Sequence, residues 1–143
     1  MDTIQEKARK NWAIRKVAKD LQVEGIWAPI PLEGIGTVQI KCRARDTVKY
    51  QEVLQRLYKP IRARYKDTVP PELQHTLLLQ IMGEAVVADW KDVPDHNGAP
   101  LPFTPDNVTM FLDLYPDARD AVAAVSGEYS LYLAQAEKDV LGN

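Results

Sequence analysis

The sequence predicts a mainly α protein of the α+β class, with four to five helices packed against one antiparallel β-hairpin. Apolar residues recur at helical spacing over several long segments. Two short extended runs flank a glycine-containing connection at residues 32–36, and proline-rich or glycine-rich stretches separate the segments. The chain has 143 residues, so a single domain over residues 1–143 is expected, long enough to bury a hydrophobic core.

The N-terminal segment, residues 1–21, is predicted to be a basic helix from residue 3 onward. Apolar residues follow the i, i+3, i+4, i+7 pattern of a helix face, at Ile14, Val17, Ala18 and Leu21. Ile4, Ala8 and Trp12 continue an apolar edge toward the start of the helix. The remaining positions carry the basic side chains of Lys7, Arg9, Lys10, Arg15, Lys16 and Lys19.

Residues 25–45 are predicted to form the hairpin, with strands at 26–31 and 37–43. The second strand alternates apolar and polar residues. Cys42 falls on its apolar side, so this lone cysteine is interpreted as a small core residue. Pro29 and Pro31 lack an N–H group, so the first strand is expected at an edge of the sheet.

Residues 47–138 are predicted to be the helical part. A helix over 47–66 should kink or break at Pro60, which cannot donate to the carbonyl of Arg56. A helix over 71–90 is apolar on most faces and should be buried, with Gly83 permitting a close helix crossing. A loop over 91–103 precedes two further helices, over 104–112 and 116–138, and the tail at 139–143 is expected to fray.

The charge is divided unevenly along the chain. Residues 1–66 carry 15 basic and 7 acidic residues, a net charge of +8, whereas residues 67–143 carry 3 basic and 13 acidic residues, a net charge of −10. Such halves suit stacking of copies into a homo-oligomer, although two solvated faces explain them equally well. No signal peptide or membrane-spanning stretch is predicted, and with one cysteine no internal disulfide is possible, so a cytosolic protein is expected.

The sequence does not predict an enzyme, a metal site or a cofactor. His75 and His96 are the candidate bases, and neither is matched by a nucleophile motif. Asp92, Asp95, His96 and Asn97 cluster near Gly98, but alignment with a calcium loop leaves both of its strongest ligands missing. A hydrogen-bonded turn is therefore the favoured interpretation of this cluster.

Nucleic-acid binding through residues 41–66 is an alternative function. This stretch holds nine basic residues interleaved with Tyr50, Tyr58 and Tyr65, a combination that can grip phosphates and stack on bases. However, Tyr58 and Tyr65 also fall on the apolar helix stripe, no nucleic-acid-binding motif is present, and the pI is about 5.7. The sequence therefore disfavours this function.

The segment from Trp90 to Asn107 resembles one found in the tail assembly chaperones of long-tailed, siphophage-type phages. It combines Trp90, an acidic turn at Gly98, the Pro102-Phe103 pair, a Thr104 cap and Asn107 in the first turn of a helix. Residues 113–116, Asp-Leu-Tyr-Pro, are also similar, as are 24–27 and 38–43 upstream, so the resemblance covers most of residues 20–137. Trp90 is expected to cover the third helix, and Phe103 to act as a hydrophobic staple.

The resemblance implies a non-catalytic role in building a phage tail. Such proteins are thought to bind the tape measure protein, to aid assembly of the tail tube protein around it, and to self-associate. The chain would then act in the cytoplasm of the bacterial host and be absent from the mature virion. A tail completion or connector protein is a further alternative. The candidate protein-contact residues are Ile26, Trp27 and Ile30 on the hairpin, and Arg56, Arg62 and Arg64 on the basic helix.

Overall fold

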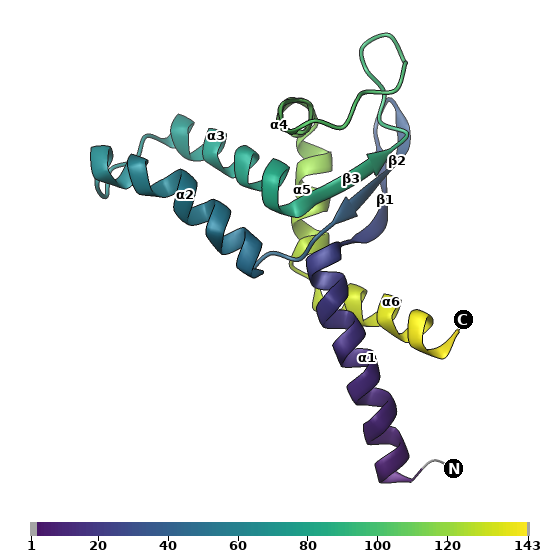
Figure 1. Cartoon of the computed structure of the whole chain (residues 1–143). Helices are drawn as coiled ribbons and strands as arrows, with labels where there is room; N and C mark the ends of the chain where they lie inside the picture. Colours follow the sequence, from purple (N-terminus) through teal and green to yellow (C-terminus); the bar gives the residue numbers. More distant parts are fainter. Residues whose placement is uncertain (1–2, 143) are drawn as a thin grey trace.

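The computed structural model describes residues 3–142 as six α-helices, one π-helical turn and a three-stranded antiparallel sheet (Figure 1). The α+β class is as predicted, but there are six helices rather than four to five. The elements in chain order are α1 (Ile4–Glu24), β1 (Ile26–Leu32), β2 (Gly36–Cys42), α2 (Val48–Tyr65), α3 (Pro71–Ile81), η1 (Met82–Val86), β3 (Val87–Lys91), α4 (Pro105–Leu114), α5 (Pro116–Ser126) and α6 (Tyr129–Leu141).

The predicted hairpin is confirmed as β1 and β2, which pair from Ile26 with Cys42 to Leu32 with Gly36. Strict alternation along β1 buries every second residue against the helices. Gly34 and Gly36 have positive φ angles, which the tight connection between the strands requires. The strand order is β1-β2-β3, so β1 lies at an edge as its prolines predict.

The third strand was not predicted, because the helix expected over 71–90 ends earlier. The α-helix stops at Ile81, widens into the π-turn η1, and becomes β3 at Val87. Strand β3 pairs with β2, so that Trp90 lies opposite Ile40 and Val87 opposite Cys42. The β-branched pair Val86-Val87 favours an extended chain, and the edge of β2 supplies a hydrogen-bonding partner that is distant in the sequence.

Helices α2 and α3 form an antiparallel arm that projects from the sheet (Figure 1). Val53 of α2, Ile81 of α3 and Ala85 of η1 form its buried core. Helix α2 continues through Pro60 to Tyr65, so the prediction of a break at Pro60 was wrong. Arg56 and Pro60 are both exposed, so water can satisfy the carbonyl that Pro60 leaves without a donor.

The helix expected over 116–138 is two helices. It is interrupted at Gly127, after which α6 turns away from α5 and pairs with α1. Ile14 and Ala18 of α1 pack on Ala136 of α6, and α6 remains helical to Leu141 instead of fraying from residue 139. Helix α1 extends to Glu24, beyond its predicted end, and every residue from Thr3 to Ala13 is exposed.

The largest core lies between the sheet and helices α4 and α5. Ile40 of β2, Val108 and Leu112 of α4, and Val122 of α5 are almost completely buried in it. Gly83 lies where η1 meets α4, and a Cβ atom at that position would lie 3.3 Å from Thr109 Oγ1. The prediction that Gly83 permits a close crossing is therefore confirmed. Helices α1 and α6 extend from this body in a different direction from the α2–α3 arm (Figure 1).

Candidate functional site

Only one of the three hairpin residues predicted to contact a partner is exposed. Ile26 and Ile30 are 8% and 2% exposed, because they lie on the face of β1 that the helices cover. That part of the prediction was wrong. Trp27 faces the other way and is 37% exposed. The ammonium groups of Lys91 and Lys41 lie 4.2 Å and 6.0 Å from its ring centroid, so the outer face of the sheet is basic and aromatic here.

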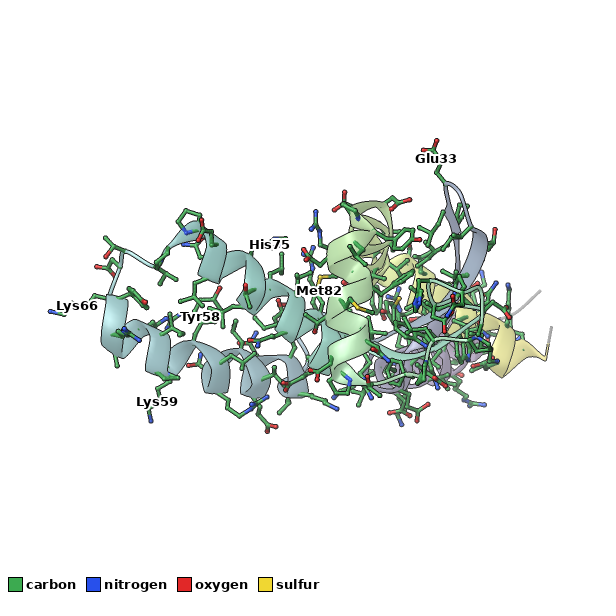
Figure 2. The ribbon with its side chains drawn as sticks, turned by 90° about the horizontal axis from the view of Figure 1, so that it is seen from above. Glu33, Tyr58, Lys59, Lys66, His75 and Met82 are labelled. Carbon is green, nitrogen blue, oxygen red and sulfur yellow. The ribbon has the colours of Figure 1, made fainter. Side chains whose placement is uncertain are left out.

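The three arginines predicted on α2 point to two different places. Arg56 forms an ion pair with Glu84, which links α2 to the π-helical turn η1. Arg62 and Arg64 lie further along the arm, with their guanidinium groups 5.6 Å and 5.4 Å from the ring centroids of Tyr58 and Tyr65. Figure 2 shows Lys59 and Lys66 pointing outward in this outer part of the arm. The outer end of the arm is therefore a basic surface.

The segment from Trp90 to Asn107 is architectural. Trp90 donates from Nε1 to the carbonyl of Leu101 at 3.0 Å, and its ring meets Phe103 and Phe111 edge-on at 5.4 Å and 5.6 Å. Trp90 belongs to a strand, not to the end of a helix, so it covers the sheet-helix core instead of the third helix. Asn107 donates from Nδ2 to the carbonyl of Pro102 at 2.8 Å.

The predicted turn and cap within this segment are confirmed. Asp95 accepts hydrogen bonds from the backbone N–H groups of Asn97 and Ala99, at 2.8 Å and 3.0 Å, and Gly98 has a φ of 82°. Thr104 accepts from the backbone N–H of Asn107 at 3.1 Å, as an N-cap does. In the described chain, residues 3–142, no group of three or more His, Cys, Asp or Glu residues could hold a metal ion.

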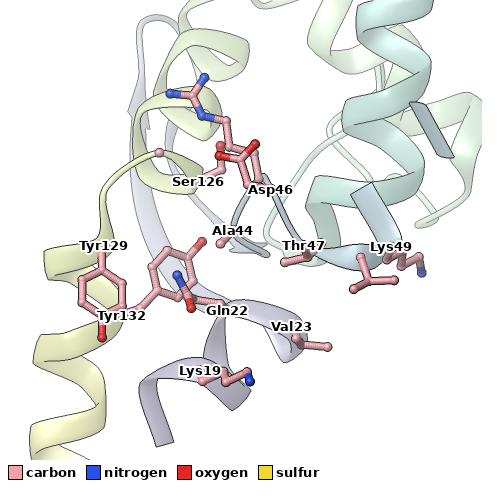
Figure 3. Close-up of a pocket in the computed structure, with 13 residues that line it drawn as sticks. Lys19, Gln22, Val23, Ala44, Asp46, Thr47, Lys49, Ser126, Tyr129 and Tyr132 are labelled. Atoms are coloured by element: carbon pink, nitrogen blue, oxygen red, sulfur yellow. The ribbon is translucent and has the colours of Figure 1, made fainter. Parts of the chain in front are cut away.

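A pocket that the sequence did not predict lies where three distant segments meet (Figure 3). Its volume is about 490 Å³. The end of α1 forms one wall, the connection from β2 into α2 forms a second, and the turn between α5 and α6 forms the third. The lining residues are Lys19, Gln22, Val23, Ala44, Arg45, Asp46, Thr47, Val48, Lys49, Ser126, Gly127, Tyr129 and Tyr132.

Hydrogen bonds and packing fix the walls of this pocket. The hydroxyl of Tyr132 donates to the carbonyl of Cys42 at 2.9 Å, and burial raises the pKa of both side chains, that of Cys42 to about 12. Arg45 donates from its backbone to the carbonyl of Ser126 at 3.1 Å, which joins the β2–α2 connection to the end of α5. A Cβ atom on Gly127 would lie 2.5 Å from the Arg45 guanidinium, so glycine lets that side chain pack close.

The pocket is suited to binding a partner that combines apolar and acidic groups. Lys19, Arg45 and Lys49 are basic, and Asp46 is the single acid among the lining residues. Val23 and Val48 contribute apolar side chains that are 56% and 76% exposed. The lining contains no histidine or cysteine, and the hydroxyl of Ser126 donates to the carbonyl of Ala123. No single run of sequence signals this pocket, because its walls come together only through the tertiary fold.

The fold and these surfaces define a small α+β protein with projecting helices and exposed apolar and basic surfaces. No helix within residues 3–142 is both long and apolar enough to cross a membrane. Residues 45–143 match the family model described as YdaY prophage protein. The match covers more than half of the chain, so the chain belongs to the YdaY prophage protein family and is a phage or prophage protein. No curated protein and no solved structure matches it.

The matched range begins at Arg45, in the connection between β2 and α2. It includes α2 to α6 and the pocket residues from Arg45 onward, whereas α1, β1 and β2 lie outside it. The pocket therefore combines walls inside the family range with a wall from α1 outside it. This boundary falls inside the basic first part of the chain, residues 1–66, so seven of its 15 basic residues lie within the matched range.

Proposed function

We propose that the chain is a non-catalytic tail assembly chaperone that binds the tape measure protein and aids assembly of the tail tube around it. The observation that carries this proposal is the pocket between α1, α2 and α6, with two exposed valines inside a basic rim. A helical segment with an apolar side and nearby acidic residues fits that surface by burial and by charge. Membership of a prophage family and the resemblance of residues 20–137 to tail assembly chaperones support the same function.

The proposal extends to where the protein acts. A chaperone of this kind binds its client in the cytoplasm of the bacterial host before the tail tube forms. It then leaves, so the chain should be absent from the mature virion. Purified phage particles analysed by mass spectrometry test this point. Finding the chain in stoichiometric amounts in washed particles would favour a tail completion or connector protein instead.

The binding test is co-expression with the tape measure protein encoded by the same prophage. We expect the chain to keep that protein soluble and to elute with it in gel filtration. Val23→Glu and Val48→Glu place a charge inside the pocket and should raise the Kd for the tape measure protein about tenfold, a loss of about 1.4 kcal/mol of binding, and so lower the co-eluting fraction. Leu131→Glu is the matched control, because Leu131 is an exposed apolar residue that does not line the pocket.

A second experiment distinguishes the chaperone from nucleic-acid binding, the second candidate function. The outer end of the α2–α3 arm carries Lys59, Arg62, Arg64 and Lys66, and this basic surface is what favours nucleic-acid binding as the second candidate. That function predicts a gel shift with duplex DNA at low salt and a weaker salt dependence in Arg62→Ala or Arg64→Ala. If the tape measure protein stays insoluble on co-expression and the chain shifts duplex DNA, nucleic-acid binding would replace the chaperone proposal.

A further inference from the structure

The N-terminal half of α1 presents an apolar stripe that no other part of residues 3–142 covers. Ile4 and Trp12 are 86% and 70% exposed, and Ala8 between them is exposed as well. Their spacing of four residues places them along one side of the helix. Short helical segments are only marginally stable in water, so covering this apolar stripe would stabilise the segment.

A second exposed apolar pair lies on the outer side of α4. Met110 and Leu114 are one turn apart and are 46% and 67% exposed. Asp106, Asp113 and Asp117 lie within a few residues of the pair along the chain. Asp113 is held in place by His75 of α3, whose Nε2 lies 3.1 Å from Asp113 Oδ1. The outer side of α4 is therefore an apolar strip with acidic neighbours.

The two surfaces are complementary in charge and in spacing. Residues 4–14 contain three basic residues and one acidic residue, a net charge of +2, whereas residues 105–114 contain two acidic residues and no basic residue, a net charge of −2. Both carry apolar side chains at intervals of four residues, so two helices can pack stripe against stripe. The opposite charges would steer the encounter and fix its orientation.

These surfaces cannot meet within one chain. Figure 1 shows the N-terminal half of α1 at the opposite end of the molecule from α4. We infer that the N-terminal half of α1 docks onto the outer face of α4 in a second copy of this chain. The contact joins two different surfaces, so a pair of copies keeps one free α1 surface and one free α4 surface, and repetition gives a ring or an open stack. Because α1 lies outside the residues matched by the family model, this contact goes beyond membership of the family.

The predicted association is weak and sensitive to salt. One helix packed on one helix buries less surface than a stable dimer needs, and exposed charges are screened as the ionic strength rises. Sedimentation velocity of the full chain should show concentration-dependent association in low salt that is lost at roughly 0.5 M salt. A chain that stays monomeric in low salt at high concentration overturns the inference.

Charge reversal tests which surfaces are involved. Lys7→Glu with Lys16→Glu reverses the α1 surface, and Asp106→Lys with Asp113→Lys reverses the α4 surface. Each double variant alone should associate at least about tenfold more weakly than the natural chain, a loss of about 1.4 kcal/mol. An equimolar mixture of the two double variants should associate again, because the unchanged α1 of one variant can dock onto the unchanged α4 of the other. Failure of the mixture to associate overturns the proposed pairing.

Matched controls distinguish this contact from general surface effects. Trp12→Ser and Leu114→Ser should each weaken association, whereas Trp27→Ser and Lys59→Glu, which change exposed residues elsewhere, should leave it unchanged. Circular dichroism identifies any variant that fails to fold. If the natural chain is monomeric and the α1 charge reversal instead abolishes binding to duplex DNA or anionic vesicles, the stripe serves that ligand and the inference is wrong. A variant that loses self-association but still keeps the tape measure protein soluble leaves the chaperone proposal intact.

Discussion

Cys42 carries a thiol whose chemistry is changed by burial in the fold. Burial raises the pKa of its thiol from 9.0 to about 12, so the folded chain holds this proton after the unfolded chain has released it. Because the unfolded state then binds fewer protons, the free energy of unfolding should fall as the pH rises from about 9 toward 12.

Cys42→Ala provides the test of this pH dependence. Removing the thiol should flatten the decline by about 1.4 kcal/mol per pH unit, the contribution of one proton. Urea titrations of both chains at several pH values between about 8 and 11 measure the slope. Equal slopes for the two proteins would show that other groups cause the decline.

Thr104 makes a local contribution to stability that can be measured in the same way. Its hydroxyl accepts from the backbone N–H of Asn107 and caps α4. Thr104→Ala should lower the free energy of unfolding by about 1 kcal/mol, whereas Thr104→Ser should keep most of it. If the alanine and serine variants unfold at the same urea concentration, the cap is not what stabilises the start of α4.

Features fixed by a few neighbouring residues were predictable from the sequence. The Asp95 turn, the Thr104 cap and the burial of Cys42 each depend on a short pattern, and each is present. The candidate contact residues Ile26 and Ile30 were placed on a surface because the strand was recognised as an edge. An edge strand still has one face against the core, and the alternation along β1 puts both isoleucines on that face.

At the scale of elements, Gly83 sets how closely η1 approaches α4. A Cβ atom there would lie 3.3 Å from Thr109 Oγ1 and 3.6 Å from the carbonyl oxygen of Pro105. Gly83→Leu should therefore overpack this contact and cost about 1–3 kcal/mol of stability. Thermal unfolding measures the loss, and Leu78→Ala, a change on the exposed side of α3, is the control.

The elements that sequence reasoning misplaced are those decided by distant partners. The run from Leu77 to Trp90 is apolar enough for a buried helix, and only pairing with β2 makes its last residues a strand. The division of the last helix at Gly127 had a local signal, because glycine is a poor residue for a helix interior. The reason for glycine there, the close approach of Arg45, came from a segment about eighty residues away.

At the scale of the whole molecule, stability should be unevenly distributed. The residues from Thr3 to Ala13 are all exposed, whereas β2 is paired on both sides. In hydrogen exchange, amides of the first three turns of α1 should therefore exchange fastest, and those of Val38 to Cys42 slowest. At concentrations where copies associate, the α1 amides should become more protected, while protection of α1 equal to that of β2 in a dilute monomer would contradict the prediction.

The pocket also belongs to this scale, since it is assembled from residues near positions 20, 46 and 128. Periodicity shows which side of a helix is apolar but not which distant helix end it meets. The charge division between the halves was visible in the sequence, whereas the places where each charge meets an exposed apolar side chain required the fold.

The prolines of β1 have a consequence for how the protein behaves when it is abundant. Pro29 and Pro31 lie on the open edge of the sheet, where neither can donate a main-chain hydrogen bond to an incoming strand. A stray extended segment, including one from a nascent chain, therefore finds a poor template there. When the protein is concentrated, this edge therefore has little tendency to start β-aggregation.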